Sequence, residues 1–212
     1  MRILRGITKK EIIGGTAVAV LFLLGSYGSA RFSDILQKYI GEGGVYGMTA
    51  YVVSIAVIAL VPLATTLPLV PIAVTVWGNI VASLLTILAW IVSASVAFYL
   101  ARRFGRRIVT RYIPMEHIQN FHNLVPRGNL LTAVFLFGLF GAPIDLLSYV
   151  IGMFTKLEYR SFITMFVLGL IPFIVFLTYT VTLSFVYQTY IVGCMVLVWL
   201  FFYAKLKNDG KN

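Results

Sequence analysis

Asp145 is the residue whose type and position most clearly suggest chemistry. It is the only charged residue between positions 128 and 155, in an otherwise apolar segment. A carboxylate at membrane depth costs about 2.5–3.5 kcal/mol on insertion scales, so it usually faces a cavity or a partner. Asp145 can therefore bind a coupling proton or cation, or position an arginine. Alternatively, it caps the helix that the apolar run Leu146–Phe154 predicts, and a cap facing a cavity would satisfy both interpretations.

A second candidate site is a group of arginines at the end of a long apolar run. The guanidinium group forms paired, charge-assisted hydrogen bonds with phosphate oxygens. These arginines are therefore predicted to contact phosphate groups or anionic lipids. The alternative is that they only anchor the helix end at the membrane interface, as any basic loop can. The group consists of Arg102, Arg103, Arg106 and Arg107.

Other chemistries lack the residues that they need. His117 and His122 have no cysteine or set of carboxylates beside them, so no metal site is expected. The sequence has no credible Ser-His-Asp arrangement, and Cys194 is expected to pack as a small apolar residue. We predict no catalytic residues, no metal and no cofactor, and hence a protein that is not an enzyme.

The elements that must hold these residues are membrane helices. Of the 212 residues, 60% are hydrophobic and 11% are charged, whereas soluble domains carry roughly 25% charged residues. Residues 12–30, 43–101 and 161–204 contain no charge at all, and about 20 apolar residues suffice for one crossing. The sequence predicts an all-α, polytopic integral membrane protein with about five to six spans.

Proline and glycine interrupt two of the apolar stretches. Pro62, Pro68 and Pro71 oppose a continuous lipid-facing helix, so residues 63–78 are expected to be re-entrant or discontinuous. Residues 138–143 break the segment 130–150 in the same way. Two broken segments in corresponding positions are typical of a transport site, and the alternative is two kinked spans. The lipid or ion path is assigned to Pro68, Pro71, Gly78, Asn79, Pro143, Asp145, Tyr149 and Gly152.

The net charge of +10 is interpreted as a signal of membrane orientation and of contact with anionic lipid headgroups, not with nucleic acid. The basic connection 102–127 and the C-terminus are expected in the cytoplasm. The N-terminus falls outside if residues 63–78 are re-entrant, which the prolines favour, and inside if they cross fully, which the charges favour. A prokaryotic cytoplasmic membrane fits this short chain better than the Golgi or endoplasmic reticulum, and a homo-oligomer is left open.

Two stretches resemble the DedA/VTT-domain superfamily, also called SNARE-associated Golgi proteins. The first leads from Pro68-Leu69-Val70-Pro71 through Trp77-Gly78-Asn79 to the run 97–105, and the second is the run 141–152. The second is similar to the family pattern Pro-Phe-Asp-Leu-x-x-Tyr-x-x-Gly. The resemblance covers about residues 60–175 and is weaker toward the DedA branch proper. The chain then divides into an N-terminal helix with a surface helix (1–44), a VTT-like core (45–183) and a last helix with a basic tail (184–212).

The resemblance implies two re-entrant hairpins that face each other across the membrane. It also implies transbilayer movement of phospholipid or polyprenyl-phosphate lipids by scrambling or ion-coupled flipping. The sequence lacks the arginine that the family often places before the second motif and the acid of DedA proteins in the first segment. Both gaps argue against proton-coupled flipping. By position, the motifs fall on Pro143, Asp145, Tyr149 and Gly152, and on Tyr99, Arg103 and Gly105.

Three functional hypotheses follow. The first is a lipid scramblase or flippase that works through a groove between the two broken helices. The second is a proton- or cation-coupled small-solute transporter that uses Asp145, and the third is a non-transporting membrane scaffold. Candidates to line the groove, unless they only bond within their own helices, are Thr65, Thr66, Thr75, Asn79, Ser148 and Tyr149.

Overall fold

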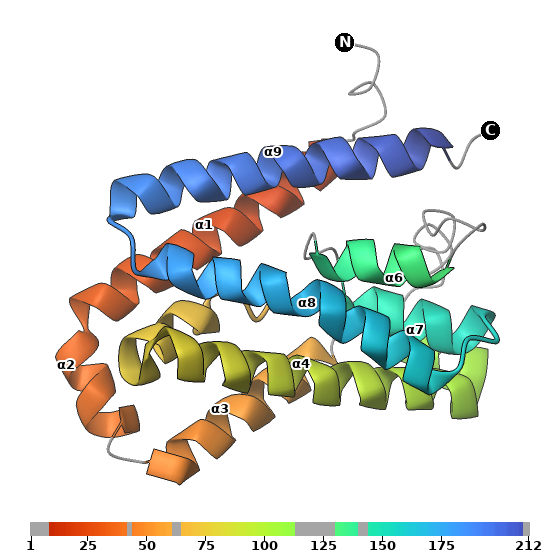
Figure 1. The fold of residues 1–212 in the computed structure, drawn as a ribbon, viewed down its shortest axis with the longest axis horizontal. Helices are drawn as coiled ribbons and strands as arrows, with labels where there is room; N and C mark the ends of the chain where they lie inside the picture. Colours follow the sequence, from red (N-terminus) through yellow and green to blue (C-terminus); the bar gives the residue numbers. More distant parts are fainter. Residues whose placement is uncertain (1–8, 42–43, 61–64, 113–129, 140–143, 210–212) are drawn as a thin grey trace.

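The computed structural model describes residues 9–41, 44–60, 65–112, 130–139 and 144–209 (Figure 1). Within these ranges the chain forms helices and turns and no strand, as the sequence predicts. In chain order the helices are α1 Lys9–Arg31, α2 Ser33–Leu36, the π-helical turn η2 Gln37–Gly41, α3 Gly44–Ala59, α4 Leu69–Tyr112, α6 Leu130–Leu139, α7 Ile144–Phe154, α8 Tyr159–Val181 and α9 Phe185–Asp209.

The first and last helices, α1 and α9, lie side by side in opposite directions (Figure 1). A Cβ on Gly15 would lie 3.4 Å from the Trp199 ring, near one end of the pair. Near the other end, the Ser26 hydroxyl donates to Gln188 Oε1 at 2.5 Å. Helices α8 and α9 meet at residues 182–184, close to the predicted junction, and Gln188 Nε2 donates to the carbonyls of Val181 and Leu183 at 2.8 Å each.

Helix α4 reverses direction near its start. Gly78 has φ +75°, a conformation that costs other residues about 1–2 kcal/mol and that glycine adopts freely. The indole of Trp90, 12 residues after Gly78, donates to the hydroxyl of Thr66, 12 residues before it, at 3.2 Å. The two segments on either side of Gly78 therefore run antiparallel, as the folded-back start of α4 in Figure 1 shows.

This geometry changes the prediction for residues 63–78. Residues 69–77 are regular helix, and the interruption precedes them, at residues 60–68, of which 61–64 lie outside the described residues. Pro71 occupies the third position of α4, where a helix has no backbone partner for an N–H group. The prolines thus begin a helix, and the reversal falls at the glycine.

Helix α6 is described to Leu139 and α7 from Ile144, and the predicted break at residues 138–143 lies mostly outside the described residues. Close backbone contacts hold both helices in the bundle. A Cβ on Gly138 would lie 3.1 Å from the Phe166 carbonyl oxygen of α8. A Cβ on Gly152 would lie 2.5 Å from the Phe98 carbonyl oxygen of α4. Small residues allow such approaches between membrane helices, where packing replaces the hydrophobic effect as the cause of association.

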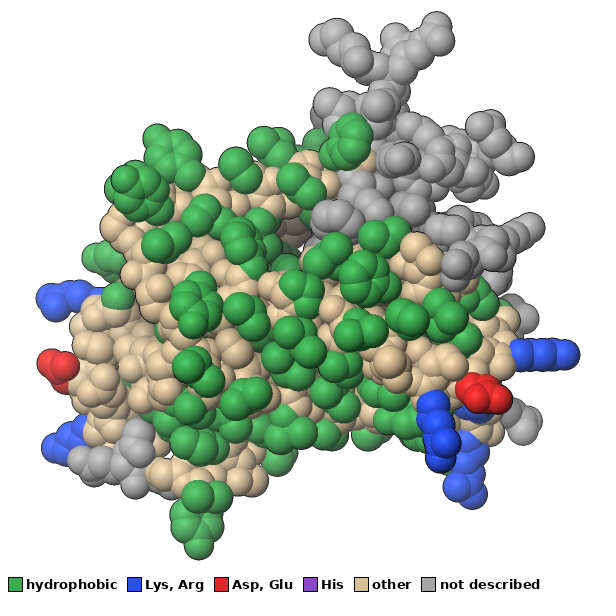
Figure 2. Space-filling view, viewed as in Figure 1, with side chains coloured by type: hydrophobic (Ala, Val, Ile, Leu, Met, Phe, Trp, Pro, Cys, Tyr) green, Lys and Arg blue, Asp and Glu red, His purple; other side chains and the backbone are tan. Residues whose placement is uncertain are grey.

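The buried core lies where α4, α7 and α8 meet, and its fully buried side chains include Phe98, Leu147, Ile151 and Phe166. The outer surface is also apolar. Figure 2 shows hydrophobic side chains spread over one face, with the described Lys, Arg, Asp and Glu side chains confined to its two ends. An apolar surface between charged ends fits a protein embedded in a bilayer.

By length and composition, three helical stretches among the described residues can cross a membrane: Ile12–Arg31, Leu69–Phe104 and Tyr159–Val181. The count rises to four if Ser33–Ile40 and Gly44–Ala59, bent by 104°, form one span. The apolar part of α9, Phe185–Phe201, is shorter. The predicted total of five to six spans therefore stays a prediction.

Candidate functional site

A stripe of buried polar side chains follows one face of α4. Ser83, Thr86 and Trp90 are spaced three and four residues apart, so they share this face. The Ser83 hydroxyl pairs with Thr178 of α8 at 2.8 Å, and the Thr86 hydroxyl pairs with Tyr51 of α3 at 2.8 Å. We call Ser83, Thr86 and Trp90 the polar stripe. The polar stripe brings hydrogen-bonding groups into the interior of the bundle, from a segment that contains no charged residue.

Tyr149 of α7 contacts the residue that follows α3. This tyrosine lies in α7, five residues after the helix begins, and 7% of its surface is exposed. Its hydroxyl donates to the carbonyl oxygen of Leu60 at 3.0 Å. Leu60 is the residue at which α3 gives way to the first interruption. The bond therefore links α7, which follows the second predicted break, to the residue at which the first interruption begins, and the shared groove stays a prediction.

Gly152 and Arg102 form a structural contact at the end of α7. The Arg102 Nε donates to the Gly152 carbonyl at 3.4 Å and its Nη2 to the Thr155 carbonyl at 2.8 Å. The guanidinium also lies 4.5 Å from the centre of the Phe98 ring. A cation at a helix C-terminus satisfies the last carbonyls and the negative end of the helix dipole. Arg102, which the sequence assigns to phosphate, is thus engaged by α7.

The other predicted phosphate contacts are placed differently. Arg103 is exposed on α4 beside a shallow hollow. Arg106 and Arg107 lie in the last turns of α4, and their side chains are outside the described residues. The sequence analysis groups the four arginines together. In the structure the Arg102 side chain turns toward the end of α7, whereas the Arg103 side chain lines the hollow.

Residues predicted at the first break act mainly through their backbone. The Pro71 carbonyl accepts from Thr75 Oγ1 at 2.9 Å, and the Asn79 carbonyl accepts from Ser83 Oγ at 2.7 Å. A Cβ on Gly25 of α1 would lie 2.6 Å from the Pro68 carbonyl oxygen. Together with Gly78 at the reversal, these residues shape the start of α4. Thr75 bonds within its own helix, which was the alternative interpretation for it.

Asp145 is the second residue of α7, in the first turn of the helix, a position at which the helix dipole favours acidic residues. The Asp145 side chain and all of Pro143 lie outside the described residues. Ser148, three residues later, is fully buried. Among the described residues no group of three or more His, Cys, Asp or Glu could hold a metal ion.

Sequence reasoning missed the polar stripe and its partners Tyr51 and Thr178. The available signal was the helical spacing of Ser83, Thr86 and Trp90 in a segment without charge. That signal is weak, because serine and threonine often bond only to their own helix in membrane proteins. Ser83 and Thr86 do both: each also donates to the carbonyl four residues before it.

These features define a helical membrane protein with an interrupted segment that contacts α7 inside the bundle. The sequence profile of the VTT domain matches residues 61–183, which is more than half of the chain. The chain therefore belongs to the VTT-domain family, the DedA/SNARE-associated family. No match was found among curated proteins, and none among solved structures. The family assignment and the apolar helices fit an integral membrane protein and a transporter-like role.

Proposed function

We propose that this protein moves phospholipids or polyprenyl-phosphate lipids between leaflets, by scrambling or flipping, along the contact between two re-entrant hairpins. The observation that carries the proposal is the Tyr149–Leu60 hydrogen bond, which links α7 to the residue at which the first interruption begins. The polar stripe supports it, since Trp90 donates to Thr66, which lies in the first interruption, and Thr86 pairs with Tyr51 of α3, which precedes it. The family assignment supports a transporter-like protein in general terms.

The proposed topology follows from the ends of the helices. Arg102, Thr155 and Tyr159 define one end of the bundle, the Arg102 end, and the contact of Gln37 with the Thr75 carbonyl at 3.4 Å places the Gly78 reversal near Arg31, at the Arg31 end. We assign α3 and residues 69–77 to one hairpin that enters and leaves at the Arg31 end. The second hairpin, α6 and α7, then enters and leaves at the Arg102 end. Helices α1, α8, α9 and the part of α4 after Gly78 cross fully.

In the proposed topology the first region is re-entrant and the N-terminus is nevertheless cytoplasmic. With two crossings, α1 and α4, before Arg102, the N-terminus and the basic connection lie on the same side. Each connecting segment is counted with the helix end next to it. On this count 15 of the 17 Lys and Arg residues belong to the Arg102 end, and the remaining two, Arg31 and Lys38, belong to the Arg31 end. The positive-inside rule then makes the Arg102 end cytoplasmic.

The physical need for such a path is the headgroup. Its charge and hydrogen-bonding groups cannot enter hydrocarbon without large desolvation costs. Interrupted helices leave backbone N–H and C=O groups at their ends without helical partners, and water or a polar ligand can use them. Helix N-termini also attract anions such as phosphate. In this proposal the headgroup passes between the hairpin ends while the acyl chains stay in lipid, and Asp145 binds headgroup amines or a cation there.

The test is reconstitution of the full chain into liposomes that contain a fluorescent phospholipid, followed by a membrane-impermeant quencher. The expected result is loss of fluorescence beyond the outer-leaflet share, without any ion gradient. Asp145→Asn should slow this exchange at least fivefold, whereas Asp34→Asn, which alters an exposed carboxylate on α2, should leave it unchanged. Lipid exchange no faster than in protein-free liposomes would refute the proposal. Solute uptake driven by a pH gradient would instead support a coupled transporter.

A further inference from the structure

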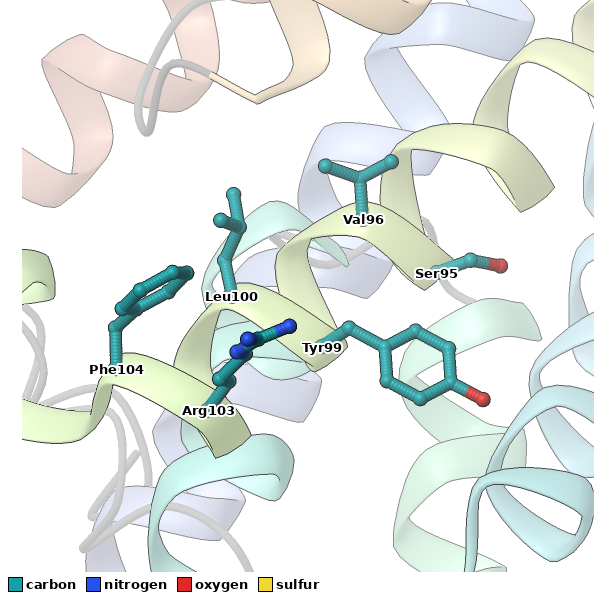
Figure 3. A pocket seen from close by; sticks show the side chains of 6 residues that line it. All are labelled: Ser95, Val96, Tyr99, Leu100, Arg103 and Phe104. Atoms are coloured by element: carbon teal, nitrogen blue, oxygen red, sulfur yellow. The ribbon is translucent and has the colours of Figure 1, made fainter.

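A shallow hollow of about 340 Å³ lies on an exposed face of α4 (Figure 3), and its lining includes neither Tyr149 nor Leu60. All six lining residues come from α4 itself. They form two adjacent rows with a spacing of four residues, so each row follows one ridge of the helix. One row is Ser95, Tyr99 and Arg103, and the other is Val96, Leu100 and Phe104.

The apolar row of the hollow continues a lipid-facing row of α4. Ile80, Leu84 and Leu88 precede it at the same spacing and are 69%, 63% and 51% exposed. Val96 and Phe104 within the hollow are 38% and 45% exposed. In a chain that resides in a bilayer, acyl chains cover such a row. The lining is mostly apolar, so a small soluble anion would leave it uncovered.

The length of the hollow matches one leaflet. Ser95 and Phe104 are nine residues apart, which corresponds to about 14 Å along a helix at 1.5 Å per residue. Half of a hydrocarbon core about 30 Å thick is about 15 Å. The hollow therefore extends from the interface at Arg103 to roughly the middle of the bilayer.

Arg103, at the polar end, is the charged residue among the six that line the hollow. Arg102 and Arg103 are both exposed. The Arg102 guanidinium donates to the carbonyls at the end of α7, whereas Arg103 lines the hollow and its guanidinium lies 5.8 Å from the centre of the Phe104 ring. In Figure 3 its guanidinium extends over the helix between Leu100 and Tyr99. A guanidinium at this position can form paired hydrogen bonds with a phosphate.

Aromatic contacts hold one wall of the hollow in place. The Tyr99 ring packs against Tyr159 of α8 with centroids 4.8 Å apart, and against Phe98 at 5.7 Å. The Ser95 hydroxyl pairs with the Tyr159 hydroxyl at 2.7 Å. Tyrosine at this depth, near a charged helix end, is typical of the membrane interface. A preformed wall lowers the entropy lost when a ligand binds.

We propose that this hollow binds one anionic phospholipid from the leaflet at the Arg102 end. Arg103 holds the phosphate, and one acyl chain lies along Val96, Leu100 and Phe104. The occupant is a lipid and not free phosphate, because the apolar row has the length of an acyl chain in one leaflet and the charge stands at its interfacial end. The site is separate from the proposed transport path, so it can be tested by binding alone.

The experiment titrates the detergent-solubilised full chain with dioleoyl phosphatidylglycerol or dioleoyl phosphatidylcholine and counts bound lipids by native mass spectrometry. Phosphatidylglycerol should bind at least fivefold more tightly. Arg103→Gln should remove this preference, while Arg160→Gln, which alters an exposed arginine at the same end of the bundle, should keep it within twofold. Leu100→Trp should fill the hollow and weaken both lipids, whereas Ile80→Trp, on the same row outside the hollow, should not.

Three results would overturn the proposal. Equal losses in Arg103→Gln and Arg160→Gln would indicate diffuse attraction to a basic surface. Displacement of phosphatidylglycerol by millimolar inorganic phosphate would indicate an anion site without an acyl chain. Equal binding of both lipids by the unchanged protein would exclude the charge contact. Arg103→Lys, which keeps the charge, should retain part of the preference, and thermal unfolding of each variant checks that it is folded.

Discussion

The glycines of the core group (α4, α6, α7 and α8) and of the outer pair (α1 and α9) have very different surroundings. In the core group, a Cβ on Gly138, Gly152 or Gly169 would collide with the backbone of a neighbouring helix. In the outer pair, Gly14, Gly28 and Gly193 have nothing within 4 Å of an added Cβ. Gly25 of α1 is the exception, because a Cβ there would lie 2.6 Å from the Pro68 carbonyl oxygen just before α4, but no glycine makes such a backbone contact between α1 and α9 themselves within the described residues. Glycine content alone therefore does not identify close helix packing.

The outer pair is held by other means. Gln188 is 5% exposed and bonds at once to Ser26 of α1 and to two carbonyls at the end of α8. Near the same end, the Tyr27 and Phe185 rings meet with centroids 5.9 Å apart. One polar side chain thus fixes three helices at the Arg31 end. The core group depends on backbone proximity and the outer pair on a polar junction, and the two should fail differently when altered.

The largest effect is expected from Gly169→Ala. The new methyl group would collide with the Phe135 carbonyl of α6, and overpacking of this kind costs about 1–3 kcal/mol or more. We expect a clear fall in the thermal unfolding temperature in detergent and loss of monodisperse protein. Gly193→Ala, in the open part of α9, should be neutral or stabilise by up to about 1 kcal/mol. Equal behaviour of the two variants would abolish the distinction between the regions.

A smaller effect is expected from Gln188→Leu, because polar contacts between membrane helices average about 0.6 kcal/mol each. Losing the three bonds should cost about 1–2 kcal/mol and should loosen α9 without disturbing α4, α6 or α7. Hydrogen–deuterium exchange should therefore rise in α9 first. Thr189→Val is the matched control, since Thr189 is exposed and bonds only within the described part of α9, to Phe185. Equal acceleration in all helices would contradict this local effect.

The smallest effect is expected within the polar stripe. Ser83→Ala and Thr178→Val each remove one partner of a hydroxyl pair. Both hydroxyls also lie within hydrogen-bond distance of a carbonyl of their own helix, and because each has a single proton, one donates to the other while the second donates to its own helix. A double-mutant cycle on thermal stability should give a coupling of about 0.6 kcal/mol. A coupling above about 2 kcal/mol would mean that this pair contributes as much to the core as a close glycine contact does.

Where the sequence succeeds, the signal is local. The charge-free run 12–30 predicts α1, which the structure extends to Lys9–Arg31, because helices continue into charged residues at the interface. The uncharged run 161–204 is long enough for two helices of about 20 residues, and the predicted boundary at residue 184 falls between α8 and α9.

Where the sequence falls short, the cause is geometry that residue types do not encode. Hydropathy continues unbroken through Gly78, because the reversal depends on one backbone angle. The prolines indicate an interruption, but they do not say whether it precedes or follows them. Likewise, nothing near Arg102 in the sequence shows that its partners are carbonyls about 50 residues away. The sequence therefore identifies the two segments that contain the candidate site, but it does not predict the contacts that their residues make.

The Ser26–Gln188 junction sets a condition on how the protein is made. The two residues are 162 positions apart, and at about 5–20 residues per second roughly eight to thirty seconds of translation separate their synthesis. During this time α1 resides in the bilayer without the helix that later covers it. The Ser26 hydroxyl must meanwhile find water, lipid or its own backbone as a partner. Closure of this pair is therefore a late event of biogenesis, and an insertion factor that shields α1 would act in this interval.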